Sequence, residues 1–398
     1  MIRTTLSLFL LLISTTLFAQ SGVVTTIAGT PGVAGYWDGP AADAMFTHPT
    51  WLDVVVGPKG TPTCDEGKSG EIFVVDRINQ LVRRIDQSGN VTTFKIVRRQ
   101  FVGAGPVVSE VPLDFDSAFG GGVLVEQPGD GCGCGAYARG VFVASTGANQ
   151  VVLGSPNGEI AARDDWSPIL GTGKAGGADG DSASAAQFNK PVGLARSKDL
   201  DQPFGDIFLK RRVYVADSGN HTIRQISWEL SFEACPQGKT VKTLAGAAGQ
   251  PGSADGTGSA ARFNMPRGIA VAPDNSIYVT DSGNHTVRRI TRDGVVTTVA
   301  GTPGVAGSDD THLNTPSGID VDANGNVYVV DTFNHAVRMI GSDGKLVTVA
   351  GQLGVSGFAD GDAATAKFNA PVGLKVAPDG SIVIADTGNN VIRRLTLK

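Results

Sequence analysis

The five histidines are the residues of this chain best suited to acid–base or metal chemistry. His48 stands outside any repeated phrase, and Trp51 follows three residues later. An imidazole near an indole can hydrogen-bond and stack on a ligand, so His48 and Trp51 are the leading binding candidates. The secondary candidates share one position of a repeated phrase: His221, His285, His335 and Asn390.

Metal binding is the less favoured role for these residues. Equivalent positions in successive repeats lie too far apart to share one small ion. The Asp-Gly loops, such as Asp179-Gly180 and Asp255-Gly256, lack the alternating acidic run and closing Glu of an EF-hand, so turn chemistry explains them better. We predict no catalytic residue, no metal ligand and no cofactor. A calcium or zinc ion in a central channel remains the alternative.

A repeated phrase supplies the elements that position these residues. Its clearest copy runs from Ala300-Gly301 to Ala350-Gly351, with short alternating runs separated by turn pairs such as Asn324-Gly325. One Asp marks each copy and gives gaps of 50 and 55 residues between the last three, and a serine fills the missing place. The markers are Asp76, Ser145, Asp217, Asp281, Asp331 and Asp386. Six units of four strands (a to d from the inside outward) predict an all-β, six-bladed propeller.

The two ends of the repeat array predict how the ring closes. The last unit stops after its third strand, 391–397. The phrase that ends other units, as in 295–301, stands at 23–29. The N-terminal strand therefore completes the last blade and removes the open edges. Wider gaps in the middle of the chain are read as loop insertions at 196–212 and 228–239.

The motif around each marker resembles that of the NHL-repeat family of β-propellers. It reads Val-Tyr-Val-x-Asp-x-x-Asn-His-x-Ile-Arg, and the matching copies are 213–224, 277–288, 327–338 and 382–393. The resemblance covers nearly all of the chain, and it implies sensor, adaptor or receptor-like roles. Related propellers also include peptide-amidating lyases and lactonases with a metal in the channel.

Most of the repeated polar residues are interpreted as scaffold. The marker Asp accepts backbone N–H groups two residues on, in an Asx turn, and pairs with the Arg seven residues later. The phrase Phe-Asn-x-Pro-x-Gly leads into the inner strands, with its Phe between blades and its Gly near the axis. Trp51 takes the place of that Gly. It either stacks on a ligand or plugs the channel mouth.

Blade topology sorts the residues onto two faces. The b–c turns and d–a loops, which carry all five histidines together with Asn79 and Gln80, lie on one face at the channel mouth. The cysteines map to the opposite face, on blades 1 to 3. We predict disulfides between blades, one joining blade 1 to blade 2 and one joining blade 2 to blade 3. The four disulfide candidates are Cys64, Cys132, Cys134 and Cys235.

The first nineteen residues differ from the rest. A basic residue, Arg3, precedes a short apolar run that ends at Ala19, which is typical of a cleaved signal peptide. We predict a signal peptide over 1–19 and a propeller over 20–398, with blade 2 (about 95–170) the most divergent. The protein is then secreted, either extracellular or periplasmic. The net charge of -5 offers no basic stripe for a nucleic-acid partner, and no membrane span is expected.

The leading functional prediction is a secreted, non-enzymatic, monomeric binding or scaffold propeller. It presents the histidine-rich face at the channel mouth to a protein, peptide or glycan ligand. The alternative is a metal-dependent lyase or a lactonase-like hydrolase with its site in the central channel. The inner-strand entrances mostly carry Gly, Ala and Val, and no nucleophile–base pair is evident, which favours the binding role.

Overall fold

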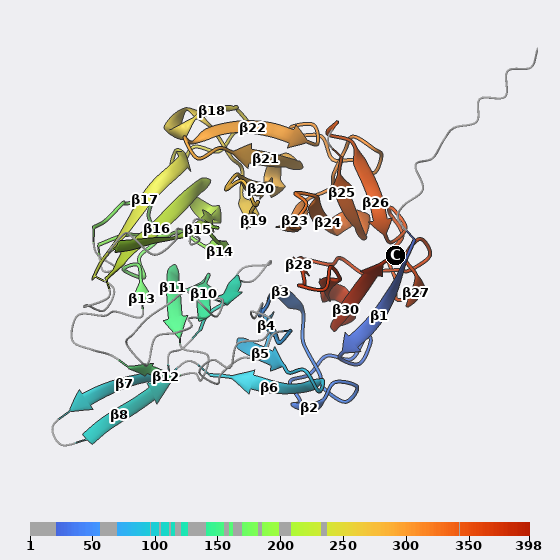
Figure 1. Cartoon of the computed structure of the whole chain (residues 1–398), viewed down its shortest axis with the longest axis horizontal. Helices are drawn as coiled ribbons and strands as arrows, with labels where there is room; N and C mark the ends of the chain where they lie inside the picture. The colour runs from blue at the N-terminus through green and yellow to red at the C-terminus, as the bar shows by residue number, and fades with distance from the viewer. Residues whose placement is uncertain are drawn as a thin grey trace, which may run out of the picture.

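The computed structural model describes residues 21–55, 70–95, 97–102, 105–110, 113–115, 121–125, 141–154, 159–161, 169–181, 185–198, 208–231, 237–341 and 343–398. Within these ranges the chain forms six antiparallel sheets arranged as a ring, and one small further sheet (Figure 1). The prediction of a six-bladed, all-β propeller is confirmed. No helix in the described part of the chain is long and apolar enough to cross a membrane.

Each blade is built from strands in the predicted order. The inner strands are β3 (Pro49–Val54), β9 (Val123–Val125), β14 (Pro191–Arg196), β19 (Pro266–Val271), β23 (Pro316–Val321) and β28 (Gly373–Val376). Next come β4 (Ile72–Asp76), β10 (Val141–Ser145), β15 (Phe208–Asp217), β20 (Ile277–Asp281), β24 (Val327–Asp331) and β29 (Ile382–Asp386). The third strands are β5 (Leu81–Ile85), β11 (Gln150–Gly154), β16 (Thr222–Ser231), β21 (Thr286–Ile290), β25 (Ala336–Ile340) and β30 (Val391–Leu397).

The outer strands complete the blades. They are β6 (Asn90–Phe94), β13 (Ile169–Leu170), β17 (Gln237–Gly246), β22 (Val295–Ala300), β26 (Leu346–Ala350) and, in blade 6, β1 (Gly22–Ala28). Two-residue strands add an outer edge to blades 1, 4 and 6: β2 (Gly39–Pro40), β18 (Gly256–Thr257) and β27 (Gly361–Asp362). Between the second and third strands of blades 3 to 6 lies one turn of 3-10 helix: Ser218–Asn220, Ser282–Asn284, Thr332–Asn334 and Thr387–Asn389.

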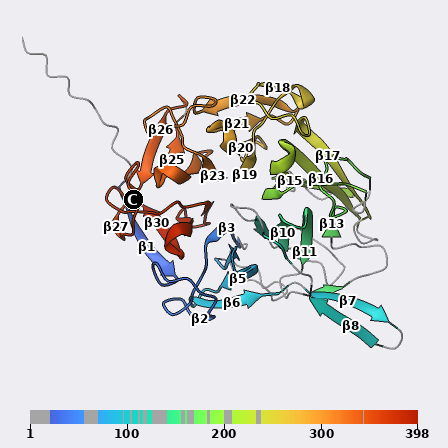
Figure 2. The same cartoon turned by 180° about the vertical axis from the view of Figure 1, so that it is seen from behind.

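The ring closes as the sequence predicts. Strand β1 pairs antiparallel with β30, with Val23 opposite Thr396, and so supplies the outer strand of blade 6. Both ends of the described chain therefore lie in one blade, which Figures 1 and 2 show from the two faces of the ring. Strand pairing satisfies the backbone groups that an open edge would leave exposed.

The apolar core lies in the seams between blades. Six buried clusters join residues of neighbouring blades, one cluster at each seam, and the cluster between blades 1 and 2 also includes Val192 and Val372. The Phe that precedes the inner strand is fully buried in four of these seams, as predicted: Phe46, Phe188, Phe263 and Phe368. Burying such side chains contributes about 1.5–3 kcal/mol each, so the seams hold the ring together.

Two regions depart from the regular blade. In blade 3 much of the predicted insertion is strand, because β15, β16 and β17 are ten residues long and extend their hairpins beyond the usual blade. In the divergent region 95–170, the hairpin of β7 (Val97–Val102) and β8 (Gly105–Glu110) forms a separate sheet with β12 (Glu159–Ala161). Figures 1 and 2 both place this sheet outside the ring. Hairpin pairing of adjacent segments accounts for the long strands of blade 3, and the outer sheet combines one hairpin with the parallel pairing of β12 and β7.

Candidate functional site

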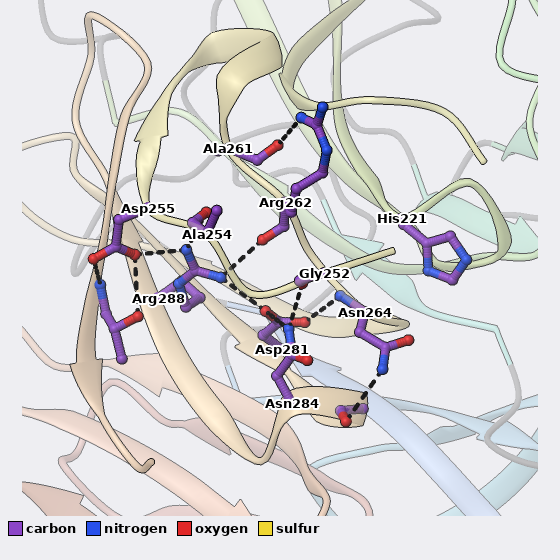
Figure 3. A network of polar contacts seen from close by, with 12 residues as sticks. His221, Gly252, Ala254, Asp255, Ala261, Arg262, Asn264, Asp281, Asn284 and Arg288 are labelled. Atoms are coloured by element: carbon purple, nitrogen blue, oxygen red, sulfur yellow. Dashed lines mark hydrogen bonds and ion pairs between the residues drawn. The ribbon is translucent and has the colours of Figure 1, made fainter. Parts of the chain in front are cut away.

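A buried arginine joins two carboxylates in blade 4 (Figure 3). Arg288 Nη1 lies 2.9 Å from Asp281 Oδ2, and Nη2 lies 2.6 Å from Asp255 Oδ1. The same guanidinium donates to the carbonyl oxygens of Arg262 and Ala254 at 2.9 and 3.0 Å. The arginine thus ties the second strand to the loop that precedes the inner strand, and its side chain has no exposure to solvent.

The marker aspartate is the centre of this network. Asp281 accepts hydrogen bonds from Asn264 N–H and Asn284 Nδ2–H, both at 2.7 Å. Burial raises the pKa of Asp281 to about 6, although these bonds and Arg288 favour the carboxylate and lower it. The predicted Asx turn is wrong, because the side chain makes no capping bond to the 3-10 turn. It reaches back to Asn264 instead, since the inner strand brings that N–H closer.

The same ion pair recurs around the ring. An arginine contacts the aspartate seven residues earlier in blades 1, 3, 5 and 6: Arg83, Arg224, Arg338 and Arg393. In blades 1, 3, 4 and 6 the guanidinium also lies over the buried Phe, at 5.2 to 5.4 Å from the ring centre. All these groups are buried and mutually paired, so their role is to hold the blade together.

The three repeat histidines form hydrogen bonds across the seams between blades. Each Nδ1 accepts a backbone N–H of the next blade: His221 from Met265 at 3.0 Å, His285 from Thr315 at 3.0 Å, and His335 from Ala370 at 2.9 Å. Side-chain oxygens take the same role at the other seams: Asn390 with His48 (2.9 Å), Asn149 with Lys190 (2.9 Å) and Gln80 with Phe115 (2.6 Å).

These bonds determine the state of the turn histidines. An Nδ1 that accepts an N–H carries no proton, so the neutral ring carries its proton on Nε2. Burial lowers the pKa of His221, His285 and His335 below the usual 6.5, which favours the same neutral form. The three histidines belong to three different seams. Their Nδ1 atoms are occupied by the hydrogen bonds between blades, so Nε2 is the atom available to a ligand.

The N–H donors of five seams belong to residues at the entrances of the inner strands. His48, Lys190, Met265, Thr315 and Ala370 directly precede the proline of an inner strand, and all have positive φ, between 42° and 55°. This left-handed conformation is unfavourable for residues with a side chain and is typical of functional sites. The side chains of His48, Lys190 and Met265 are exposed. Burial and the neighbouring Arg77 lower the pKa of His48.

Trp51 lies apart from these exposed side chains. It is 8% exposed and belongs to the apolar cluster of the seam between blades 1 and 2, which extends to Val192 and Val372 of two other inner strands. At the corresponding position the other strands have glycine, and a β-carbon on Gly193 would overlap the carbonyl oxygen of Arg267. Of the two interpretations of Trp51, this burial fits the plug better than the ligand platform.

A charged cluster on the inner strands was missed from the sequence. Lys375 Nζ lies 3.2 Å from Asp53 Oδ1 and 3.5 Å from Asp320 Oδ2, which joins blades 5, 6 and 1. Burial lowers the pKa of Lys375, but the two carboxylates outweigh it and raise the pKa overall. The sequence could have revealed this cluster, because all three residues stand four positions after the inner-strand proline. Blades 3 and 4 have Ala195 and Ala270 at that position.

His312 differs from the other histidines. Its Nδ1 lies 2.8 Å from Asp309 Oδ1, so a carboxylate orients the ring in blade 5. Hydrogen bonds, chiefly from Thr311 and His312, hold the pKa of Asp309 well below its usual range. In other blades the carboxylate of this loop pairs with the buried arginine, whereas Arg338 bonds to the carbonyl oxygens of Asp309 and Leu346 instead.

The candidate metal ligands and the cysteines lie in different parts of the chain. In the described part of the chain, no group of three or more His, Cys, Asp or Glu is arranged to hold a metal ion. The four cysteines, Cys64, Cys132, Cys134 and Cys235, and the signal segment 1–19 lie outside the described residues. The disulfide pairing and the signal peptide therefore stay predictions.

The NHL repeat family matches residues 263–290 and 313–338, which are in blades 4 and 5. Protein SUPPRESSOR OF QUENCHING 1 of Arabidopsis thaliana is 27% identical over 383 residues, which is 93% of this chain and 27% of that protein. NHL repeat-containing protein 2 of Homo sapiens is 36% identical over 99 residues, 25% of this chain and 12% of that protein. The chain thus spans a small part of these relatives.

Solved structures share the fold at low identity. A Bacteroides thetaiotaomicron protein of unknown function has a TM-score of 0.60 and 20% identity, over 95% of this chain and 76% of that one. An auxiliary nutrient binding protein from the same organism has a TM-score of 0.59 and 16% identity, over 95% and 77%. Identities this low show similarity of fold alone.

The ring of six antiparallel sheets, each with four or five strands and closed by the first strand, defines a six-bladed β-propeller. The family match and the repeated Asp–Asn–Arg network then identify the repeats that build it. This chain is an NHL-repeat β-propeller.

Proposed function

We propose that this protein is a secreted, non-enzymatic propeller that binds a ligand at the channel mouth. The contrast between two sets of repeated positions supports the proposal. The scaffold positions carry the same residue types in most blades, as in Asp281 and Arg288. The mouth position just before the inner-strand proline differs in each of five blades: His48, Lys190, Met265, Thr315 and Ala370.

The physical setting of these residues favours recognition. Their backbone N–H groups donate to side chains of the neighbouring blade, and these bonds hold the backbone in its unfavourable conformation. The mouth is therefore rigid before a ligand arrives. An imidazole, an ammonium group and a thioether offer hydrogen-bonding, electrostatic and apolar contacts to one ligand. A protein, peptide or glycan of mixed polarity suits this combination.

A thermal-shift screen tests the proposal. The purified protein is heated with metal ions, oligosaccharides and peptides, and a ligand at 100 times its Kd raises the free energy of unfolding by about 2.7 kcal/mol. The mouth variant is His48→Ala/Lys190→Ala/Met265→Ala. Ala370 occupies the same position in blade 6 with positive φ, so alanine is compatible with this backbone.

The expected result is a ligand whose shift disappears in the mouth variant and persists in Val295→Ala, an exposed position in the outer strand of blade 4. Shifts that survive in the mouth variant would rule out binding at this place. A shift given by a metal ion alone, with substrate turnover, would favour the lyase or lactonase-like alternative.

A further inference from the structure

A second surface on this face carries unusual exposed apolar side chains. They lie on the d–a loops and b–c turns of three consecutive blades, 5, 6 and 1. We call these residues the rim patch: Tyr36, Trp37, Ile78, Phe333, Val355 and Phe358. Tyr36 is 71% exposed and Trp37 67%, and the other four are between 40% and 51% exposed.

The repeats themselves show that the scaffold does not need these side chains. In blades 1, 3 and 4, Nη2 of the buried arginine donates to a loop carbonyl, which belongs to Trp37, Ala178 and Ala254 respectively. The residues before them are Tyr36, Gly177 and Ser253. The same backbone thus carries aromatic residues in blade 1 and small ones in blades 3 and 4.

The turns repeat this pattern. Ile78 N–H donates to Thr47 O, and Phe333 N–H to Asn314 O, at the place where Gly219 and its equivalents donate in other blades. Both glycine and large apolar residues therefore fit this turn. Placing Ile78 and Phe333 in water brings no packing gain, so their presence is best explained by a function on the surface.

Hydrogen bonds across the seams link the loops and turns that carry the rim patch. Each d–a loop is hydrogen-bonded to the turn of the preceding blade: Gly354 N–H donates to Asn334 O, and Gly32 N–H to Asn389 O. The first bond brings the loop of Val355 against the turn of Phe333. Phe358 lies over the Arg393 guanidinium, 4.6 Å from the ring centre, which holds it in place.

We infer that the rim patch binds a partner protein whose surface pairs apolar side chains with lysine or arginine. Tyrosine and tryptophan are the residues most enriched at the energetic centres of protein interfaces. Their loop backbones are already fixed by hydrogen bonds, so binding loses little conformational entropy. Two exposed carboxylates on the loops of the rim patch, Asp43 and Asp362, have no ion pair with any described residue, and they complement a basic partner.

The inference rests on the proposed binding role but uses a different surface from the channel mouth. Its test is a random-peptide phage library, selected on the intact protein. The rim variant Tyr36→Gly/Trp37→Ala/Ile78→Gly copies Gly177, Ala178 and Gly219 of blade 3, so the fold tolerates these residues. Equal urea midpoints for the rim variant and the natural protein check that both are folded.

We expect selected peptides to combine aromatic or aliphatic residues with Lys or Arg. Their affinity should fall about tenfold or more in the rim variant, and also at high salt. The mouth variant His48→Ala/Lys190→Ala/Met265→Ala should bind them normally, so failure of the mouth proposal leaves this one standing. Peptides that bind the rim variant equally well, or a library without such peptides, would overturn it.

Two further outcomes would assign another occupant. In a Trp166→Phe variant, the quenching of fluorescence by acrylamide reports the exposure of Trp37, because the other two tryptophans, Trp51 and Trp228, are buried. Protection of Trp37 by oligosaccharides, without peptide binding, would make the patch a glycan site. Self-association in sedimentation that the rim variant abolishes would make the occupant a second copy of this chain.

Discussion

Blades 2 and 4 solve the same packing problem in opposite ways. Blade 4 buries Asp281, Asn284 and Arg288 in one polar network. Blade 2 has neither the acid nor the base at the corresponding positions, which carry Ser145, Ala148 and Val152. Ser145 is fully buried, accepts Asp114 N–H at 2.9 Å and donates to Asp114 O at 3.4 Å, whereas Val152 joins the apolar cluster that contains Trp51 and Phe115.

The difference teaches that the network behaves as a unit. A buried ion pair can be replaced by apolar groups at little cost, but removing one partner leaves a charge without compensation. Blade 2 has changed all three positions together and filled the space with Val152 and its neighbours. The NHL motif is therefore one way of packing a blade, and the seam hydrogen bond from Asn149 to Lys190 survives its loss.

The largest effect is expected when the blade 4 network is cut in half. Arg288→Met leaves the Asp281 carboxylate buried without its ion pair, so the free energy of unfolding falls by about 3–5 kcal/mol in urea denaturation. The triple variant Asp281→Ser/Asn284→Ala/Arg288→Val copies blade 2 and should lose less than the single variant. A triple variant less stable than Arg288→Met would contradict the view of the network as a unit.

The reverse change tests blade 2. Ser145→Asp places a carboxylate in a buried site with Val152 in place of the arginine, and it should lower the free energy of unfolding by about 2–3 kcal/mol at pH 7. Burial raises the pKa of this new carboxyl group in the folded state, so the loss should shrink as the pH falls and the group is protonated. Ser145→Asn, uncharged and similar in size, should cost less and show little pH dependence.

The seam hydrogen bonds make a smaller, pH-dependent contribution. His221, His285 and His335 have folded-state pKa values below 6.5, so their contribution is complete above pH 6.5. It is lost as the pH falls below 6.5, because the unfolded chain binds protons first. Each bond is worth about 1 kcal/mol.

Asparagine already makes the same bond in blades 2 and 6, which supplies the control. The variant His221→Asn/His285→Asn/His335→Asn should keep more of its stability between pH 7 and pH 5 than the natural protein. Both proteins share the buried aspartates, so the difference between their urea midpoints isolates the histidines. Parallel pH profiles would show that Nδ1 protonation does not break the seams.

The smallest effect on stability is expected at the rim. Trp37→Ala changes a side chain that is 67% exposed, on a backbone that carries alanine in blades 3 and 4. Its urea midpoint should correspond to a change within about 0.5 kcal/mol. A larger loss would mean that Trp37 belongs to the scaffold, against the distinction drawn between network and rim.

The repeat itself made most of the fold predictable. The marker Asp gave the blade count, and the split last unit gave the closure by β1. The partners of Asp281 were harder to foresee. Asn264 precedes Asp281 by seventeen residues, and the pairing of β19 with β20 brings its N–H to the carboxylate, not a local turn. Sequence spacing alone favours the local bond.

The site was predicted in part. The turn position of His221 was identified, but its bond to Met265 depends on how closely two blades approach, which no spacing within a blade reveals. The cluster of Asp53, Asp320 and Lys375 was visible as one register position in three blades. It was overlooked because the inner strands were judged by their glycines and small apolar residues.

Because β1 closes the ring beside β30, the position of the chain ends can be moved to another blade by circular permutation. Lys398 N–H donates to Ser21 O at 2.8 Å, so the two ends of the described chain already touch. A short linker between them, with new ends opened in the turn Thr291–Gly294 of blade 4, would leave every strand pair in place. The blades would then be synthesised in a new order, and blade 4 would be the one completed by strands from both ends of the chain.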